Sequence, residues 1–437
     1  MDEGVGGRRR FLKGAAMAAG GGLLTGSISG AAPAAGAPPM PPGAEPVFDV
    51  KRFGAVGDGK ADDTGAIQRA LDEAGLAGGI VFLPGGKYLA PGNLSIPPSV
   101  CLQGVFQSPP RSGVDGGGSI LLATAGKGLE TGPPFILLHT NSTVRGLAVF
   151  YPDQGGPVYP YPPTIQGIGD DCSVVDVLLM NPYYGVDFGT HPCGRHWIKS
   201  LYMQAIRRGV YVAECFDVGR IEDVHVWPFW RIGDKKVDAI TSHQGEAFVL
   251  ARTDWEYMIN CFCINYAVGY RFTTSASGPG NVVLTQCGSD EGPVSTSVLV
   301  EASQGHAGIS FVNGQFMGQR HVDVRPTNTG PVKFTACGFW GMNGITGSMA
   351  RLQGKGQVSF QNCHFTGWAQ AGDSQAPAIS AENGGLSMVG CDFMDAGKNQ
   401  VSLASGVEAA AIIGCRLRGG AKIHNSSKGT VETIGNV

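Results

Sequence analysis

The chain has 437 residues, and its 69 glycines, 27 prolines and 15% charged residues are typical of a turn-rich β protein. The formal net charge is −3 and no basic stripe is present, which argues against a nucleic-acid-binding surface, because such a surface needs clustered lysine and arginine. Beyond the N-terminal segment, no apolar run approaches the roughly 18 residues of a membrane-spanning helix. We therefore expect neither a nucleic acid nor a membrane as a partner.

The N-terminal segment has the features of an export signal. Three consecutive arginines at 8–10 precede a weakly apolar stretch rich in glycine and alanine, which is the layout of a twin-arginine signal peptide. We expect residues 1–45 to be signal peptide and linker, and residues 46–437 to form a single domain, with 46–105 as its N-terminal cap and first coils. The mature protein is then expected to be periplasmic or secreted.

The segment that follows the signal contains one predicted helix. Apolar residues recur on one face of Thr64–Ala74, which predicts a short amphipathic helix. The residues at its start offer helix-capping groups: Asp62, Asp63 and Thr64. Such a helix would cover the open end of a repetitive β structure, where strand edges are otherwise unpaired.

A repeat extends through the rest of the chain. Segments such as VSFQNCHF, LSMVGCDF and VKFTACGF share one pattern of apolar residues around a reference position. The reference residues are Leu147, Val177, Leu201, Val224, Cys261, Cys287, Gly314, Cys337, Cys363, Cys391 and Cys415. A period mostly in the twenties with strand alternation predicts a solenoid of about eleven or more β coils, each with a second strand about ten residues later. The cysteines in this column are then small buried side chains rather than disulfide partners.

The opening motif carries a family resemblance. FGAVGDGKADDTGAIQRAL, followed by GGIVFLPGGKYL, resembles the entry segment of the pectate-lyase superfamily, which is related to the polygalacturonases. The resemblance implies an all-β, right-handed parallel β-helix with a short N-terminal capping helix, acting on a polysaccharide or oligosaccharide. Proteins of this kind are monomers or associate side by side. The superfamily includes hydrolases, lyases, epimerases, transferases and phage tailspikes, so the fold alone does not define the reaction.

Three acids share one place in the coil register. Asp170, Asp217 and Asp254 each stand seven positions before a reference residue, and Gly194 takes that position in the coil between the first two. Coils stack about 4.8 Å apart, so neighbouring acids would lie about 5 Å apart and acids two coils apart about 9.6 Å apart. These separations bracket those of retaining and inverting glycosidases. We expect the three acids to be catalytic; the alternative is that they cap backbone turns.

The polar and aromatic neighbours of these acids are expected to bind substrate. They are Asp171, Arg195, His196, Glu214, His225, Trp227, Trp230, Arg252, Trp255 and Glu256. The GDDC stretch at 169–172 resembles the aspartate pair of polygalacturonases, although the companion NTD, GHG and RIK motifs of that family are absent. Residues 227–245 exceed a normal coil and predict a projecting loop, whose tryptophans either stack on sugars or anchor the loop.

No zinc-binding motif is present, and we expect no metal and no cofactor. The main hypothesis is therefore an exported glycoside hydrolase. One alternative is a polysaccharide lyase in which Ca²⁺ neutralises a uronate and Arg195, Arg252 or Lys199 removes the C5 proton. Others are a glycosyl-transferring enzyme and a non-catalytic glycan-binding β-helix.

Overall fold

The computed structural model describes residues 47–105, 117–227, 234–290, 295–341, 344–371 and 374–437. These residues all belong to one compact unit, Gly43–Val437. The predicted signal peptide lies outside the described residues, so it stays a prediction. Within the described residues, no helix is both long enough and apolar enough to cross a membrane.

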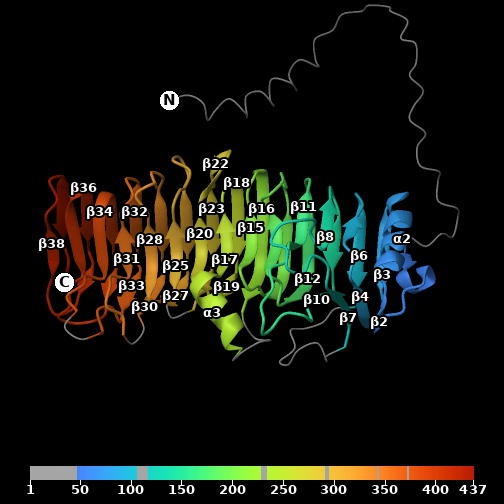
Figure 1. Cartoon of the computed structure of the whole chain (residues 1–437). Coiled ribbons are helices and arrows are strands. Elements are labelled where there is room, and N and C mark those ends of the chain that lie inside the picture. Colours follow the sequence, from blue (N-terminus) through green and yellow to red (C-terminus); the bar gives the residue numbers. More distant parts are fainter. Residues whose placement is uncertain (1–46, 106–116, 228–233, 291–294, 342–343, 372–373) are drawn as a thin grey trace, which may run out of the picture. The chain divides into compact units, whose positions relative to one another are not determined.

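The unit is a right-handed parallel β-helix of about 13 turns, which confirms the predicted fold class. Strands of successive coils pair in parallel and stack along one axis, from α2 at one end to β38 at the other (Figure 1). Each coil contributes to three sheets, which we name the first, second and third sheets in chain order within a coil. A coil therefore places each of its residues directly above one residue of the preceding coil.

The first sheet contains β1 (Val47–Asp49), β3 (Gly79–Leu83), β6 (Val100–Gly104), β9 (Thr143–Arg145), β18 (Thr253–Ile259), β23 (Val282–Thr285), β26 (Ile309–Val312), β29 (Val332–Thr335), β32 (Gln357–Gln361) and β39 (Thr430–Ile434). The second sheet contains β2 (Asp58–Asp62), β4 (Gly86–Ala90), β7 (Ser119–Ala123), β10 (Ala148–Phe150), β19 (Phe262–Cys263), β24 (Gly288–Ser289), β27 (Gln315–Gly318), β30 (Gly338–Gly341), β33 (His364–Thr366), β35 (Asp392–Phe393) and β37 (Arg416–Leu417). The third sheet contains β5 (Leu94–Ile96), β8 (Ile136–His139), β11 (Pro163–Ile168), β13 (Tyr184–Phe188), β15 (Arg208–Val212), β17 (Glu246–Leu250), β20 (Val268–Phe272), β25 (Thr296–Val300), β28 (Arg320–Val324), β31 (Ala350–Leu352) and β38 (Ile423–Asn425).

Five longer strands turn a corner and belong to two sheets. β12 (Ser173–Met180), β14 (Trp197–Gln204) and β16 (Cys215–Val226) run from the first sheet into the second, and β34 (Ile379–Val389) and β36 (Val401–Ile413) run from the third into the first. A separate hairpin joins β21 (Thr274–Ser275) to β22 (Gly278–Pro279).

The predicted reference column is confirmed by the strand register. Leu201 pairs with Val224, and the pairs that flank the later members continue the column coil by coil to Cys415. Its members are buried, including every cysteine in it. All eleven cysteines of the chain are free thiols, including the six of the reference column, for which the sequence predicts buried side chains rather than disulfides.

A left-handed corner precedes the reference residue in each repeat. The residue at this position has a φ between 52° and 65°. The column consists of Gly146, Asp176, Ser200, Asp223, Asn260, Gln286, Asn313, Ala336, Asn362, Gly390 and Gly414. Glycine, asparagine and aspartate tolerate this conformation best, because other residues meet a steric cost of about 1–2 kcal/mol. The corner turns the chain from the first sheet into the second.

The predicted capping helix is present as α2 (Thr64–Gly75), next to the 3₁₀ helix η1 (Val50–Phe53). Its apolar face, which includes Ile67 and Leu71, is buried. The expected capping role of Asp63 is wrong, because its carboxylate instead accepts hydrogen bonds from the backbone of Val56 and Gly57. Asp63 thereby holds the glycine-rich entry loop against the start of the helix.

The segment predicted as a projecting loop contains a helix. α3 (Lys235–Gln244) begins at Asp234, whose carboxylate accepts hydrogen bonds from the backbone of Lys236 and Val237. β17 then returns the chain to the third sheet. The described part of this insertion is therefore mainly helical, because Asp234 provides an N-cap and Val237 and Thr241 provide a buried face.

Two ladders of stacked phenylalanines fill the C-terminal half of the core. Phe311, Phe334 and Phe360 stack with centroid separations of 5.3 and 5.1 Å. The second ladder is Phe316, Phe339, Phe365 and Phe393. Identical register in successive coils places the rings above one another, where they bury large apolar area.

We expect Phe339→Ala to lower the free energy of unfolding by about 3–5 kcal/mol, because it opens a cavity in the middle of a ladder. Met394→Ala, which shortens an exposed side chain, should change it by no more than about 0.5 kcal/mol. Urea titrations of both variants measure the difference, and equal effects would contradict the ladder's importance.

Candidate functional site

The predicted column of acids exists at the corner where the third sheet leads into the first. Extending the strand register by three residues places Asp170 beside Gly194 and Gly194 beside Asp217. Asp254 lies opposite the irregular stretch between Cys215 and Val218, which contains Asp217. We name Asp170, Asp171, Asp217 and Asp254 the acid corner. A Cβ atom on Gly194 would lie 2.9 Å from Asp170 Oδ1 and 3.7 Å from the Cβ of Asp217. The glycine thus leaves space between two acids that are two coils apart.

Arg195 bridges three of these acids. Its Nε and Nη2 donate to the two oxygens of Asp171 at 2.8 and 2.9 Å, Nη2 also donates to Asp170 at 3.0 Å, and Nη1 to Asp217 at 3.2 Å. Hydrogen bonds with Arg195 lower the pKa of Asp171, and those with Asp171 and Asp217 raise the pKa of Arg195. Three carboxylates surround one guanidinium, so this cluster carries excess negative charge.

Asp254 has its own arginine. Arg252 Nη1 lies 2.6 Å from Asp254 Oδ1, and its guanidinium lies 5.5 Å from the ring centroid of Phe216. Two different arginines therefore pair with the acids. The sequence predicts that both arginines contact substrate. The contacts place Arg195 and Arg252 within the acid corner itself.

Exposed aromatic rings lie beside the acid corner on the outer face of the first sheet. Trp255 directly follows Asp254 and is 38% exposed. Trp197 and Tyr257 both flank Arg220 in the register, and Phe216 directly precedes Asp217. We name Trp197, Phe216, Trp255 and Tyr257 the aromatic strip. Large exposed apolar groups gathered in one place are typical of a binding surface.

Glu214 supports a projecting hairpin. Its Oε2 accepts a hydrogen bond from Ser277 Oγ at 2.6 Å, in the turn between β21 and β22. Burial raises the pKa of Glu214, but hydrogen bonds with Ser275 and Ser277 outweigh this and lower it. The hairpin extends beyond the stack of strands in Figure 1. Glu214 is therefore a hairpin anchor in this structure.

The structure does not bring His225 and Trp227 to the acids. About 20 Å of strand separates Asp217 from Asp223, where the chain turns the left-handed corner onto the second sheet. There, the ring of His225 lies 6.2 Å from Tyr202, 5.7 Å from Trp227 and 5.2 Å from Phe262. A groove of about 880 Å³ is lined by the rings of Tyr202, His225 and Phe262 and also by Asn260, Gln286 and Asn313. Trp230 lies outside the described residues.

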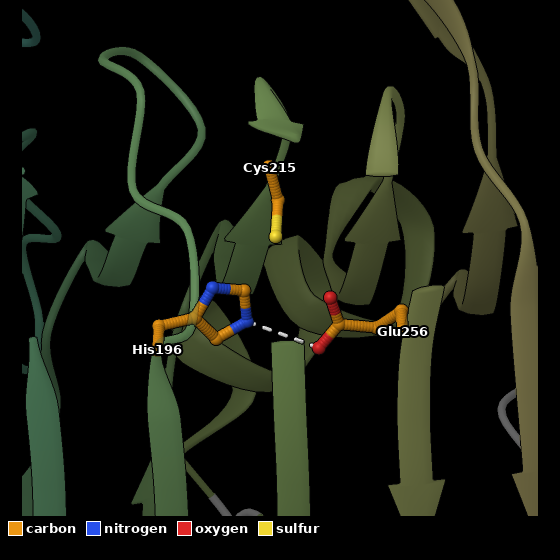
Figure 2. Close-up of side chains that lie close together, drawn as sticks. All are labelled: His196, Cys215 and Glu256. Atoms are coloured by element: carbon orange, nitrogen blue, oxygen red, sulfur yellow. Dashed lines mark hydrogen bonds and ion pairs between the residues drawn. The ribbon is translucent and has the colours of Figure 1, made fainter. Parts of the chain in front are cut away.

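His196 and Glu256 are not surface residues, and their predicted role in contacting substrate from outside is wrong. Both are fully buried inside the coil, where they face Cys215 (Figure 2). His196 Nε2 lies 3.0 Å from Glu256 Oε1, and Nδ1 lies 2.8 Å from the carbonyl oxygen of Cys193. Thr253 Oγ1 donates to the other oxygen of Glu256 at 3.3 Å.

The charge state of His196 follows from these neighbours. Burial by itself lowers the pKa of His196, but the charge of Glu256 and hydrogen bonds with Cys215 and Glu256 raise it well above 6.5. Nε2 thus faces Glu256, and Nδ1 faces the carbonyl oxygen of Cys193. The interior of the coil contains a buried histidine–glutamate pair directly below the acid corner.

Strand alternation was the signal that could have found this pair. Trp255 and Tyr257 point outward, while Glu256 and Met258 point inward. His196 likewise precedes the buried Ile198 by two positions. Residues two apart in a strand share a face, so Ile198 and Met258 indicate the inward direction.

We expect Glu256→Gln to lower the free energy of unfolding by about 3–5 kcal/mol, because it leaves a buried histidine without its charge partner. Glu222→Gln breaks an ion pair with Lys199 that is 3.5 Å long and partly exposed, and it should cost no more than about 1 kcal/mol. Urea titrations compare the two variants. A loss for Glu256→Gln as small as that of the control would show that the pair is unimportant for stability.

The comparisons with known proteins agree with this architecture. Residues 47–135 match the model of a family described as rhamnogalacturonase A/epimerase, pectate lyase-like. Over 46 residues the chain is 59% identical to mannuronan C5-epimerase AlgE3 and to alginate lyase 7, both of Azotobacter vinelandii. That stretch covers 10% of this chain, and only 2% and 5% of the length of those two proteins.

Two solved structures share the fold over most of the chain. The A-module of mannuronan C-5 epimerase AlgE4 from Azotobacter vinelandii matches with a TM-score of 0.54 and 16% identity, over 87% of this chain and 98% of that one. The N-terminal fragment of bacteriophage Phi29 gene product 12 matches with a TM-score of 0.65 and 13% identity, over 89% and 70%. The chain therefore has the right-handed parallel β-helix fold, and its first part, residues 47–135, is similar to the pectate lyase-like family.

Proposed function

We propose that this protein is a carbohydrate-active enzyme that hydrolyses glycosidic bonds of a polysaccharide or oligosaccharide bound at the acid corner. The observation that carries the proposal is the register of Asp170, Asp217 and Asp254 at one exposed corner of successive coils. A pair of carboxylates at a defined separation is the machinery of most glycosidases.

Asp170 and Asp217 are the pair that best suits this chemistry. Their backbones lie two coils apart, or about 9.6 Å at the usual strand spacing, and the guanidinium of Arg195 contacts both carboxylates from between them. Inverting glycosidases separate their carboxyl groups by about 6.5–9.5 Å to leave room for a water molecule, so Arg195 would move aside when the substrate and the water bind. Asp217 makes the longest contact with Arg195, at 3.2 Å, and we assign it the role of general acid. Asp170, held by Gly194 N at 2.9 Å and by Arg195, is the better base.

The charge of the corner favours a neutral sugar. Three carboxylates surround Arg195, so a uronate carboxylate would meet net repulsion there. The aromatic strip supplies apolar faces on which sugar rings stack, and Asp254 and Arg252 supply hydrogen bonds for hydroxyl groups. An elongated substrate would lie along the coil axis across both features.

A second candidate is chemistry at C5 of a uronate, which the names of the mannuronan C5-epimerases and alginate lyase 7 suggest. The candidate bases for it are Arg195, Arg252 and Lys199. Each forms an ion pair with a carboxylate, and the raised pKa of Arg195 opposes its use as a base. Ca²⁺ would be the cofactor in this case, as a neutraliser of the uronate.

We expect Asp170→Asn and Asp217→Asn each to lower kcat on a cleaved glycan by roughly 10²–10⁴-fold, because each removes a general acid or base. Asp254→Asn should mainly raise KM. The matched control is Asp223→Asn, which changes an exposed acid on the same strand as Asp217 but at the left-handed corner, about 20 Å along the strand. Wild-type activity in all three test variants would overturn the assignment.

The products separate the reaction classes. Hydrolysis of neutral glycans yields new reducing ends and no ultraviolet absorbance. Absorbance of an unsaturated uronate, abolished by a chelator, would replace the hydrolase proposal with a lyase. Uptake of deuterium at C5 of an uncleaved polyuronate in D₂O would indicate an epimerase, and binding without any of these changes would indicate a glycan-binding protein.

A further inference from the structure

Three side chains that can bind metal ions meet inside the coil. His196 directly precedes β14, Cys215 begins β16, and Glu256 belongs to β18. One ligand atom from each lies within 4.8 Å of the others, and all three residues are fully buried. In Figure 2 the imidazole, the thiol and the carboxylate point toward a common centre.

A backbone carbonyl group fixes the orientation of the His196 ring. The contact of its Nδ1 with the carbonyl oxygen of Cys193, at 2.8 Å, turns Nε2 toward Glu256 and Cys215. Histidines that bind metals almost always donate their other N–H to a carbonyl or carboxylate, which fixes the ring and its tautomer. Thr253 Oγ1 holds the carboxylate of Glu256 in the same way.

The coil between His196 and Glu256 leaves room for them to meet. The residue between them in the register is Gly219. A Cβ atom there would lie 2.1 Å from Glu256 Oε2 and 2.6 Å from His196 Nε2. Its φ is not in the left-handed region, so the glycine is required for space rather than for backbone conformation. Any side chain at 219 would occupy the centre of the cluster.

The types of ligand atom in the cluster indicate which metal ion it would bind. Thiolate, imidazole and carboxylate together are typical ligands of Zn²⁺, whereas Ca²⁺ and Mg²⁺ prefer oxygen alone. Ligand bonds of about 2.0–2.3 Å give tetrahedral edges of about 3.3–3.8 Å. The separation of 3.0 Å between His196 Nε2 and Glu256 Oε1 needs only a small expansion to reach such an edge.

We propose that His196, Cys215 and Glu256 provide three of the four ligands of a Zn²⁺ ion in the interior of the β-helix, with a water molecule as the fourth. The ion would tie three successive coils together. It would also fix the backbone positions of the acid corner. His196 follows Arg195, Cys215 is two residues from Asp217, and Glu256 is two residues from Asp254. The site is independent of the proposed reaction, since its occupancy is measured without a substrate.

The first measurement is the metal content of the full chain purified from zinc-supplemented culture, by inductively coupled plasma mass spectrometry. We expect about one zinc ion per chain in the wild type, a loss of at least about tenfold in Cys215→Ser, and full retention in Cys261→Ser. Cys261 is the matched control, because it is equally buried but lies outside the cluster. Wild-type protein without zinc would overturn the proposal, as would equal zinc loss in both variants.

Cobalt keeps the proposal testable if Cys215→Ser does not fold. Wild-type protein produced in cobalt-supplemented medium should show the thiolate-to-cobalt absorption band in the near ultraviolet, and so should Cys261→Ser. The absence of this band in a wild-type protein that contains cobalt would show that no cysteine binds the ion, and would overturn the proposal. Neither measurement depends on which glycan, if any, the protein cleaves.

Discussion

The pairing of each strand with the strand directly before and after it along the axis determines almost everything else in this molecule. These backbone hydrogen bonds keep successive coils about 4.8 Å apart, so residues at the same register form straight columns. Columns that point inward become ladders of cysteine or phenylalanine. A column that points outward at a corner gathers the acids, although they are far apart in the chain.

The same constraint decides which polar groups enter the core. An inward position is normally apolar, because a buried charge is costly without a partner. His196 and Glu256 satisfy each other across a coil that has only a glycine at the facing position. On the outside, Arg195 joins Asp170 and Asp217 across three coils, two of which are also spanned by the pair of His196 and Glu256. In this segment, ionisable side chains thus connect neighbouring coils on both the inner and the outer face of the β-helix.

Much of this could be predicted from the sequence, because register is a matter of counting. The repeat around Cys261 and its equivalents predicted the interior column, and the same count aligned Asp170, Asp217 and Asp254. The helix α2 was predicted to begin at the residue where it does begin. These features depend on local periodicity, which a single sequence contains in full.

The errors arose where periodicity is interrupted. Asp254 lies near the start of β18, and the alternation of outward and inward side chains becomes regular only at Trp255. Glu256 was therefore predicted to point outward, although its side chain points inward. His225 is near Asp217 in the chain, but the left-handed Asp223 turns it onto a different sheet. His196, Cys215 and Glu256 stand 19 and 41 residues apart, and no motif has that spacing. Only the folded coil brings them together.

The buried contact between His196 and Glu256 affects how the protein would unfold. In a solenoid each repeat is coupled to its nearest neighbours, so unfolding can start at an end and proceed one coil at a time. The contact between His196 and Glu256 instead joins two coils that are not adjacent. The strand between them, β16, has only Gly219 at the facing position. Unfolding a single strand of this segment would therefore separate or expose a buried polar pair. Fraying from either end should therefore stop at these coils, which would unfold together as one block.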